Sequence, residues 1–166
     1  MIKIGLVIDA MTEFYTGDVD RINHFLKVYG FAKMIGELEG LEEDTQEILE
    51  VTALVHDIGI RISEEKYNSS AGTYQELEGP PVAEEMLGKL GYRKELIDRV
   101  SYLVGHHHTY SKIDGMDYQI LVEADFLVNI HENGIKKREV EQIRKKIFKT
   151  RTGLALLDRL YQKLSL

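Results

Sequence analysis

Apolar residues recur at helical spacing along most of this chain, whereas alternating β-branched runs bounded by turn residues are scarce. The clearest helix is expected after Asp18 or Asp20, either of which can cap it, and Gly40 helps to end it. Its apolar positions follow the i, i+3, i+4 pattern and are Ile22, Phe25, Leu26, Tyr29 and Ala32. The pattern predicts an all-α fold.

Other helices are expected on both sides of this one. Residues 2–15 read as a helix or, less favourably, as a short strand. Asp44 with Glu47 three residues later reads as a capping box that opens the next helix. Residues 61–78 are polar, so we expect loops there and at most a short helix.

The second half of the chain continues the helical pattern. Gly79-Pro80-Pro81 fits a helix start with proline in the first turn, and this helix is expected to stop at Gly91. Further helices are expected over residues 93–103, 117–134 with Asp117 as the cap, 137–148 and 153–164.

Length and composition indicate one globular domain spanning residues 1–166. The chain holds 43% apolar and 30% charged residues, its two prolines are adjacent, and no Ser/Gly-rich linker divides it. A net charge of −7 argues against binding to a nucleic-acid polymer, which needs a basic face. Because cysteine is absent, thiolate metal sites are excluded, and a metal ion has to be held by His, Asp, Glu or backbone oxygen.

No apolar run approaches the roughly 18 residues that span a bilayer. The apolar N-terminal stretch is soon followed by Asp9 and Glu13, and it lacks the long core and cleavage site of a secretory signal. We therefore expect a cytoplasmic protein without a membrane partner. The sequence leaves the oligomeric state open.

An adjacent histidine and aspartate, His56-Asp57, close an apolar helical run. Imidazole and carboxylate are costly to leave unpaired at the end of a buried helix, and both are good ligands for a divalent cation. Asp125 lies inside the apolar run of residues 121–128, so it also needs a partner or a cation. His24 lies on another helix. Ligands on separate helices are typical of metal sites in helical bundles.

The order His24, then His56-Asp57, then Asp125 resembles the H…HD…D signature of the HD-domain superfamily of metal-dependent phosphohydrolases. Ala-Leu-Val-His-Asp-Ile-Gly is similar to the central motif of that family, and Glu-Ala-Asp-Phe-Leu-Val-Asn resembles its closing aspartate helix. The resemblance runs over about residues 20–129. It implies an all-helical bundle in which these four side chains hold a divalent ion between helices. The mixed ligand set suits Mn, Fe, Co, Ni or Mg.

The resemblance also points to residues for a second metal ion or for the substrate phosphate. His106 and His107 match the adjacent-histidine position of many members, as catalytic or substrate-binding residues, and His108 is expected at the surface with Tyr110. Where members with two ions usually have a histidine before a glycine, this chain has Glu78. Glutamate can ligate a metal or act as a general base, so a second ion stays open.

Two arginines are further candidates for binding a phosphate. Arg61 follows the HD pair closely and could reach a phosphate near the metal, with a surface position as the alternative. Arg151 opens the last helix, whose N-terminus suits an anion, with ordinary capping as the alternative. The basic runs at residues 136–138 and 144–146 are expected to form a solvated face, and His131 is expected at the surface.

The leading hypothesis is metal-dependent hydrolysis of a phosphate ester or anhydride in a small, nucleotide-like molecule. The ion would polarise a phosphoryl oxygen and lower the pKa of a bound water. If a second ion binds, Asp57 would bridge the two; if not, the histidines would neutralise charge on the substrate. One alternative is a non-catalytic ligand-binding or regulatory module that keeps the metal for structure. Another is oxygen chemistry at a di-iron site, against which Glu78 counts.

Overall fold

The computed structural model describes residues 2–162, and every regular element among them is helical. In chain order the elements are α1 (Ile4–Phe14), α2 (Val19–Glu39), α3 (Glu43–Val55), α4 (Ile60–Tyr67), α5 (Gly72–Lys89), α6 (Lys94–Val104), the short 3-10 helix η1 (Tyr110–Lys112), α7 (Met116–Glu132), α8 (Lys137–Lys146) and α9 (Arg151–Tyr161). No strand occurs in residues 2–162, so the predicted all-α fold is confirmed.

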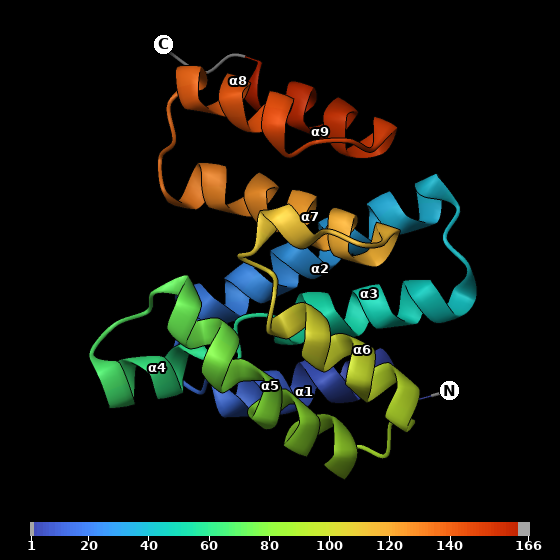
Figure 1. The fold of residues 1–166 in the computed structure, drawn as a ribbon, viewed down its shortest axis with the longest axis vertical. Coiled ribbons are helices and arrows are strands. Elements are labelled where there is room, and N and C mark those ends of the chain that lie inside the picture. The colour runs from blue at the N-terminus through green and yellow to red at the C-terminus, as the bar shows by residue number, and fades with distance from the viewer. Residues whose placement is uncertain (1, 163–166) are drawn as a thin grey trace.

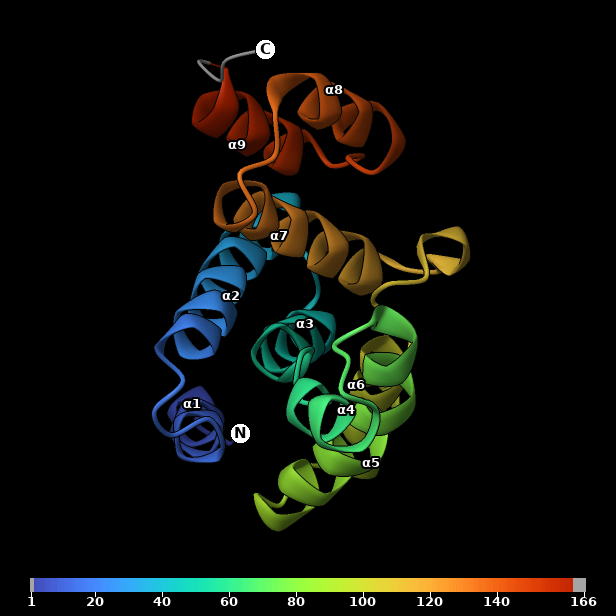
Figure 2. The same ribbon diagram turned by 90° about the vertical axis from the view of Figure 1, so that its left-hand side faces the viewer.

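The third helix, α3, lies at the centre of the bundle. Figures 1 and 2 show it among α1, α2, α6 and α7, with α8 and α9 paired beyond α7. Its Leu49 and Ala53 belong to an apolar core shared with α2, α7 and α9, whereas its Val51 and Leu54 belong to a second core shared with α1, α5 and α6. All four side chains are fully buried. Because both cores meet on α3, the residues at its C-terminal end lie inside the bundle.

Both ends of α2 lie where the sequence pattern places them. Asp18 Oδ1 accepts the backbone N–H of Arg21 at 3.1 Å, which caps the helix. Gly40 ends it with a φ of 75°, in the left-handed region that favours glycine. These caps hold His24 in the second turn of a helix that is 21 residues long.

The expectation of loops over residues 61–78 is wrong, because α4 and α5 occupy most of this segment. Pro80 and Pro81 lie inside α5 instead of opening a helix. Their missing N–H groups leave two carbonyls of the preceding turn without helix partners, which usually ends a helix. Tertiary packing outweighs this loss. Helix α5 packs along α6, and a Cβ atom added to Gly59, at the start of α4, would lie only 2.7 Å from the backbone nitrogen of Gly79.

Two predicted helix starts differ from the structure because arginines bind the supposed capping residues. The capping box of Asp44 and Glu47 is wrong: α3 begins without a side-chain cap, and these carboxylates bind Arg93 at 2.9 and 2.6 Å. Asp117 lies in the first turn of α7 and binds Arg99 with both oxygens, each at 2.8 Å. Arg93 is the residue that precedes α6, and Arg99 lies on that helix. A local sequence pattern contains no information about such a distant partner.

The two C-terminal helices, α8 and α9, fall close to the predicted ranges 137–148 and 153–164. They pack on each other, and α9 also packs on α2 and α7 (Figure 1). Residues 163 and 164 of the second range lie outside the described residues. In residues 2–162, each helix is too short or too polar to cross a membrane.

The last residue of α2, Glu39, is expected to stabilise α9 in a pH-dependent way. Its Oε1 accepts the backbone N–H of Thr152 at 2.8 Å, and the hydroxyl and N–H of Thr152 lower the pKa of the carboxyl. The stabilisation is therefore complete above the ordinary Glu pKa of about 4.3 and is lost as the pH falls through the lower folded value. Glu39→Ala should reduce the free energy of unfolding by about 1 kcal/mol at neutral pH and by less at about pH 3, in urea titrations.

The control for this prediction is Glu84→Ala, which removes an exposed carboxylate from the middle of α5. We expect its small effect to be the same at both pH values. Equal losses at both pH values for Glu39→Ala would contradict the prediction.

Candidate metal centre

Four side chains meet where α2, the end of α3 and α7 come together. His24 lies on α2, His56 follows the last residue of α3, Asp57 comes next, and Asp125 lies in the middle of α7. His24, His56 and Asp125 are buried, whereas Asp57 keeps 18% of its side chain exposed. The structure therefore brings together the four residues of the sequence pattern, with one edge of the site open to solvent.

The ligand atoms of these side chains are as close as ligands of one ion. His24 Nε2 lies 3.1 Å from both Asp57 Oδ2 and Asp125 Oδ1. His56 Nε2 lies 3.4 Å from the same two oxygens. With metal–ligand bonds of about 2.1 Å, neighbouring ligands are about 3.0 Å apart in an octahedron and about 3.4 Å apart in a tetrahedron. Each imidazole–carboxylate pair thus has the spacing of adjacent ligands.

Hydrogen bonds on the far side of each imidazole determine which nitrogen faces the centre. His56 Nδ1 donates to Ala53 O at 2.8 Å, and His24 Nδ1 donates to Glu132 Oε2 at 2.9 Å. In the neutral rings both Nε2 atoms then carry lone pairs, and they lie 3.3 Å apart. Asp125 Oδ1 is buried without a hydrogen-bond partner among the described residues. Facing lone pairs and an unpaired carboxylate oxygen require a cation, so these residues fit a divalent metal ion.

The pKa values of the site residues also indicate that the site favours a positive charge. Burial lowers the pKa of His24, but the carboxylates of Asp125 and Asp57, each 3.1 Å from its Nε2, outweigh burial and raise the pKa to about 10. Burial also lowers the pKa of His56, yet the same carboxylates bring it well above its usual value. Burial raises the pKa of Asp57, but His56, His107 and His24 bring it well below its usual value. The carboxylates that raise the pKa of the two imidazoles would equally stabilise a bound cation, and a metal ion that binds there displaces the imidazole protons.

Asp57 also belongs to a second group of possible ligands, with His107 and His108. Its Oδ1 lies 3.4 Å from His107 Nε2, which is buried and has no hydrogen-bond partner within residues 2–162. The expectation of a surface position for His108 is wrong, because this ring is half-buried with Nε2 3.0 Å from Gln75 Oε1. Burial lowers the pKa of His108 to about 4. One carboxylate therefore faces two groups of ligand atoms.

His106 lies outside both groups in the described part of the chain. Its Nδ1 donates to Tyr102 O at 2.7 Å, and its ring stacks on Tyr102 with centroids 4.1 Å apart. The turn is held by Glu76, which accepts the His108 N–H at 2.9 Å. The structure therefore places His107 and His108, rather than His106 and His107, beside Asp57. Three consecutive residues point in different directions, so the sequence alone could not make this choice.

Glu78, at the position where family members with two ions usually have a histidine, lies outside both groups. It is on α5, where it accepts hydrogen bonds from Lys66 Nζ at 2.9 Å and from the Tyr67 hydroxyl at 2.8 Å. Lys66 and Tyr67 lower the pKa of its carboxyl. The structure thus shows Glu78 in an ion pair between α4 and α5.

The two arginine candidates also lie outside both groups. The guanidinium carbon of Arg61 is 4.6 Å from the centre of the Phe14 ring, a cation–π contact between α4 and α1. Arg151 opens α9 beside Glu39 at the end of α2, about 22 Å along that helix from His24. Arg61 is thus partly buried in a contact between helices, which differs from both the phosphate contact and the surface position considered from the sequence. For Arg151 the geometry favours the alternative, an ordinary helix start. His131 is exposed, as expected.

Sequence reasoning missed two side chains that support the site. Tyr15 follows α1, is 2% exposed, and donates its hydroxyl to the carbonyl of Asp57 at 2.8 Å. Glu132 lies two helical turns after Asp125, on the same face of α7, and binds the Nδ1 of His24. The i, i+7 spacing from Asp125 is a signal that could have found Glu132. No local signal marks Tyr15, because 42 residues separate it from Asp57.

Removal of the Tyr15 hydroxyl is expected to loosen the segment that carries Asp57. Tyr15→Phe leaves the packing unchanged but deprives a carbonyl of its partner, so we expect a loss of about 1–2 kcal/mol in the free energy of unfolding. Urea denaturation measures this. The matched control is Tyr29→Phe, at a half-buried tyrosine on α2 whose hydroxyl has no hydrogen bond to the described residues. An equal loss of unfolding free energy in both variants would show that the hydrogen bond from Tyr15 to the Asp57 carbonyl does not contribute to stability.

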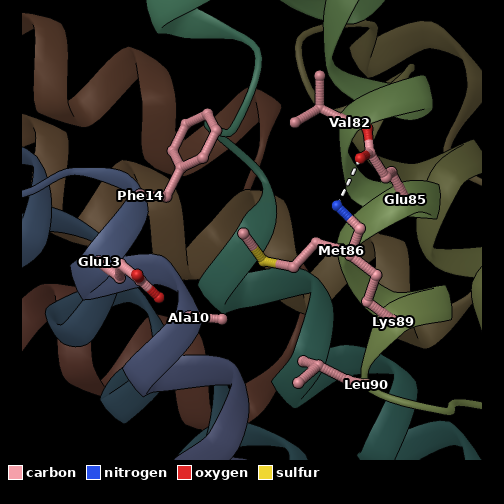
Figure 3. Close-up of a pocket in the computed structure, with 8 residues that line it drawn as sticks. All are labelled: Ala10, Glu13, Phe14, Val82, Glu85, Met86, Lys89 and Leu90. Atoms are coloured by element: carbon pink, nitrogen blue, oxygen red, sulfur yellow. Dashed lines mark hydrogen bonds and ion pairs between the residues drawn. The ribbon is translucent and has the colours of Figure 1, made fainter.

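A separate groove lies between α1 and α5 (Figure 3). It has a volume of about 410 Å³ and an apolar wall that includes Phe14, Met86 and Leu90, with Glu85 and Lys89 paired at 2.6 Å beside it. None of the ligand candidates from α2, α3 or α7 lines it. The groove is therefore distinct from the candidate metal centre.

This chain is similar in sequence to one family model and in structure to one solved protein. The family model of the HD domain matches residues 21–149. A crystal structure described as a predicted HD superfamily hydrolase from an uncultured Thermotogales bacterium is similar, with a TM-score of 0.67 and 20% sequence identity. The alignment covers 94% of this chain and 83% of that chain, and at such identity it supports the fold alone. A search of curated proteins gave no match.

Proposed function

This chain belongs to the HD domain family, and on that premise we propose that it is a divalent-metal-dependent phosphohydrolase. The proposed substrate is a phosphate ester or anhydride of a small, nucleotide-like molecule. One observation carries the proposal: each of two imidazole nitrogens lies 3.1–3.4 Å from each of two carboxylate oxygens, in a site that needs a cation. We assign the ion to His24, His56, Asp57 and Asp125. A bound divalent ion polarises a phosphoryl oxygen and lowers the pKa of its water.

The residues beside Asp57 support a role in binding the phosphate. His107 Nδ1 donates to Val104 O at 2.8 Å, so its Nε2 is the atom turned toward Asp57. When the imidazole is charged, this Nε2 can donate a hydrogen bond to a phosphate oxygen. When the imidazole is neutral, the same atom offers a lone pair to a second metal ion. We assign any second ion to Asp57, His107 and His108. Asp57 is then the shared ligand.

An exposed aromatic ring beside the site supports a nucleotide-like substrate. Tyr110 is 40% exposed and contacts Phe126 on α7 with ring centroids 5.3 Å apart, and burial and the nearby Asp125 carboxylate raise the pKa of its hydroxyl to about 12. Aromatic rings at the edge of a site stack on nucleobases without requiring a particular base. We therefore place the base on Tyr110 and the phosphate near Asp57 and His107.

The experiment begins with metal analysis of the purified protein. Hydrolysis of nucleoside phosphates and other phosphate esters is then measured with added Mn²⁺, Co²⁺, Ni²⁺ and Mg²⁺. We expect phosphate release with at least one metal and loss of that activity on chelation. Asp125→Asn protein, purified in the same way, is the control for a contaminating phosphatase. Metal-loaded protein that hydrolyses nothing in the panel would contradict the proposal and favour a binding module.

A further inference from the structure

His24 differs from the other histidines of the site because the backbone cannot orient its ring. His56 and His107 lie just after helices, where their Nδ1 atoms reach the free carbonyls of Ala53 and Val104 at 2.8 Å. His24 lies inside α2, where carbonyls are occupied by the helix's own hydrogen bonds. Its Nδ1 therefore needs a partner from another element.

Glu132 supplies this partner from α7. Its Oε2 lies 2.9 Å from His24 Nδ1, while Asp125 Oδ1 on the same helix lies 3.1 Å from His24 Nε2. Seven residues separate the two acids, so their Cα atoms are about 10 Å apart along one face of α7. That separation lets one helix hold opposite edges of a single imidazole. Asp125 meets the edge that faces the ion, and Glu132 meets the edge that faces away from it.

The charge of Glu132 is balanced at the surface. Lys27, one turn after His24 on α2, lies 3.0 Å from Glu132 Oε1, so each carboxylate oxygen has its own partner. Glu132 keeps 28% of its side chain exposed and lines a polar pocket of about 580 Å³. The other residues of this pocket are Asp20, Asn23, Lys27, His131 and Asn133.

We propose that Glu132 is a positioning residue of the metal centre. Its carboxylate holds His24 in the tautomer that presents the Nε2 lone pair to the ion, and it makes this nitrogen a stronger ligand. The inference rests on the metal site of the proposed function, whatever reaction that site performs. Removal of a carboxylate that accepts a hydrogen bond from a metal-bound histidine typically lowers metal affinity by about 10–100-fold.

The test is titration of metal-free protein with Co²⁺, whose visible absorption bands report both occupancy and ligand field. Glu132→Gln removes the charge and nearly keeps the shape, whereas Glu132→Asp keeps the charge but shortens the side chain away from Nδ1. We expect each variant to bind Co²⁺ about 10–100-fold more weakly and to shift the absorption bands. Asp20→Asn removes a charge from the same pocket without a hydrogen bond to His24 in the described structure, and should change affinity less than about threefold.

Thermal melts separate positioning from a simple tie between α2 and α7. A positioning role predicts that the rise in Tm caused by Co²⁺ is smaller in the Glu132 variants than in wild type. Wild-type affinity and wild-type absorption bands in both Glu132 variants would overturn the inference, as would an equal loss in Asp20→Asn. A wild-type protein that binds no Co²⁺ would instead refute the metal site itself, and with it the proposed function.

Discussion

Asp57→Ala is expected to abolish phosphate hydrolysis and metal binding while the helical circular-dichroism spectrum stays largely intact. Among the described residues, Asp57 is the carboxylate shared by both ligand groups, with Oδ2 3.1 Å from His24 Nε2 and Oδ1 3.4 Å from His107 Nε2. Loss of the metal's contribution of several kcal/mol to the barrier corresponds to a fall in kcat/KM of at least about a thousandfold. Initial-rate kinetics and metal analysis of the purified variant measure the two effects.

A conservative variant and a control make the Asp57 result specific. Asp57→Asn nearly keeps the size of the side chain but removes the charge, and we expect it to lose activity as well. Asp98→Ala removes an exposed carboxylate that binds Lys94 on α6, and it should keep both activity and metal. If Asp57→Ala retained metal and activity while folding normally, the assignment of this centre would be wrong.

Gly59→Ala is expected to destabilise the fold strongly. A Cβ at Gly59 would lie 2.7 Å from the Gln75 carbonyl oxygen and the Gly79 nitrogen and 2.9 Å from the Gly79 Cα. All three are backbone atoms of α5, so no side chain can rotate away, and α4 and α5 have to separate. We expect a loss of about 3 kcal/mol in the free energy of unfolding by urea denaturation. Because Gly59 is two residues from Asp57, metal affinity should fall as well.

The matched control is Gly30→Ala, in the middle of α2, where an added Cβ meets no atom within 4 Å. Alanine is a better helix former than glycine, so this variant should gain about 0.5–1 kcal/mol. The φ of Gly59 is −79°, which any residue adopts, so the predicted cost comes from the clash alone. A Gly59→Ala protein as stable as wild type would mean that α4 and α5 are not packed this closely.

The fold could be predicted wherever local periodicity and packing agree. Asp18 and Gly40 bound α2 as the caps suggested, and the C-terminal helices fall near their expected ranges. The prediction failed for residues 61–78, because the polar composition argues against a helix there and the Pro80-Pro81 pair indicates that a helix begins only afterwards. Helix α5 runs through them because its glycines allow contact with α4 and α6, and a window of sequence does not contain those neighbours.

Some residues of the candidate site could likewise be predicted from the sequence, and others could not. His24, His56, Asp57 and Asp125 could be selected from their chemistry, since polar ligands within apolar helical runs need partners. The choice between neighbouring histidines could not, because it depends on the direction of each side chain in the turn after α6. Tertiary structure gave that turn its conformation, and it put His107 and His108 beside Asp57.

Residue type and spacing are enough to predict that this chain folds as helices and which side chains could hold a cation. Helical periodicity and ligand chemistry are properties of residue type and spacing, so they can be read without coordinates. Which atoms of these side chains meet depends on how the helices pack. Tyr15 contacts the Asp57 segment across 42 residues and Glu132 contacts His24 across 108. Such contacts depend on how helices cross, and the crossing is set by the packing of the whole core around α3.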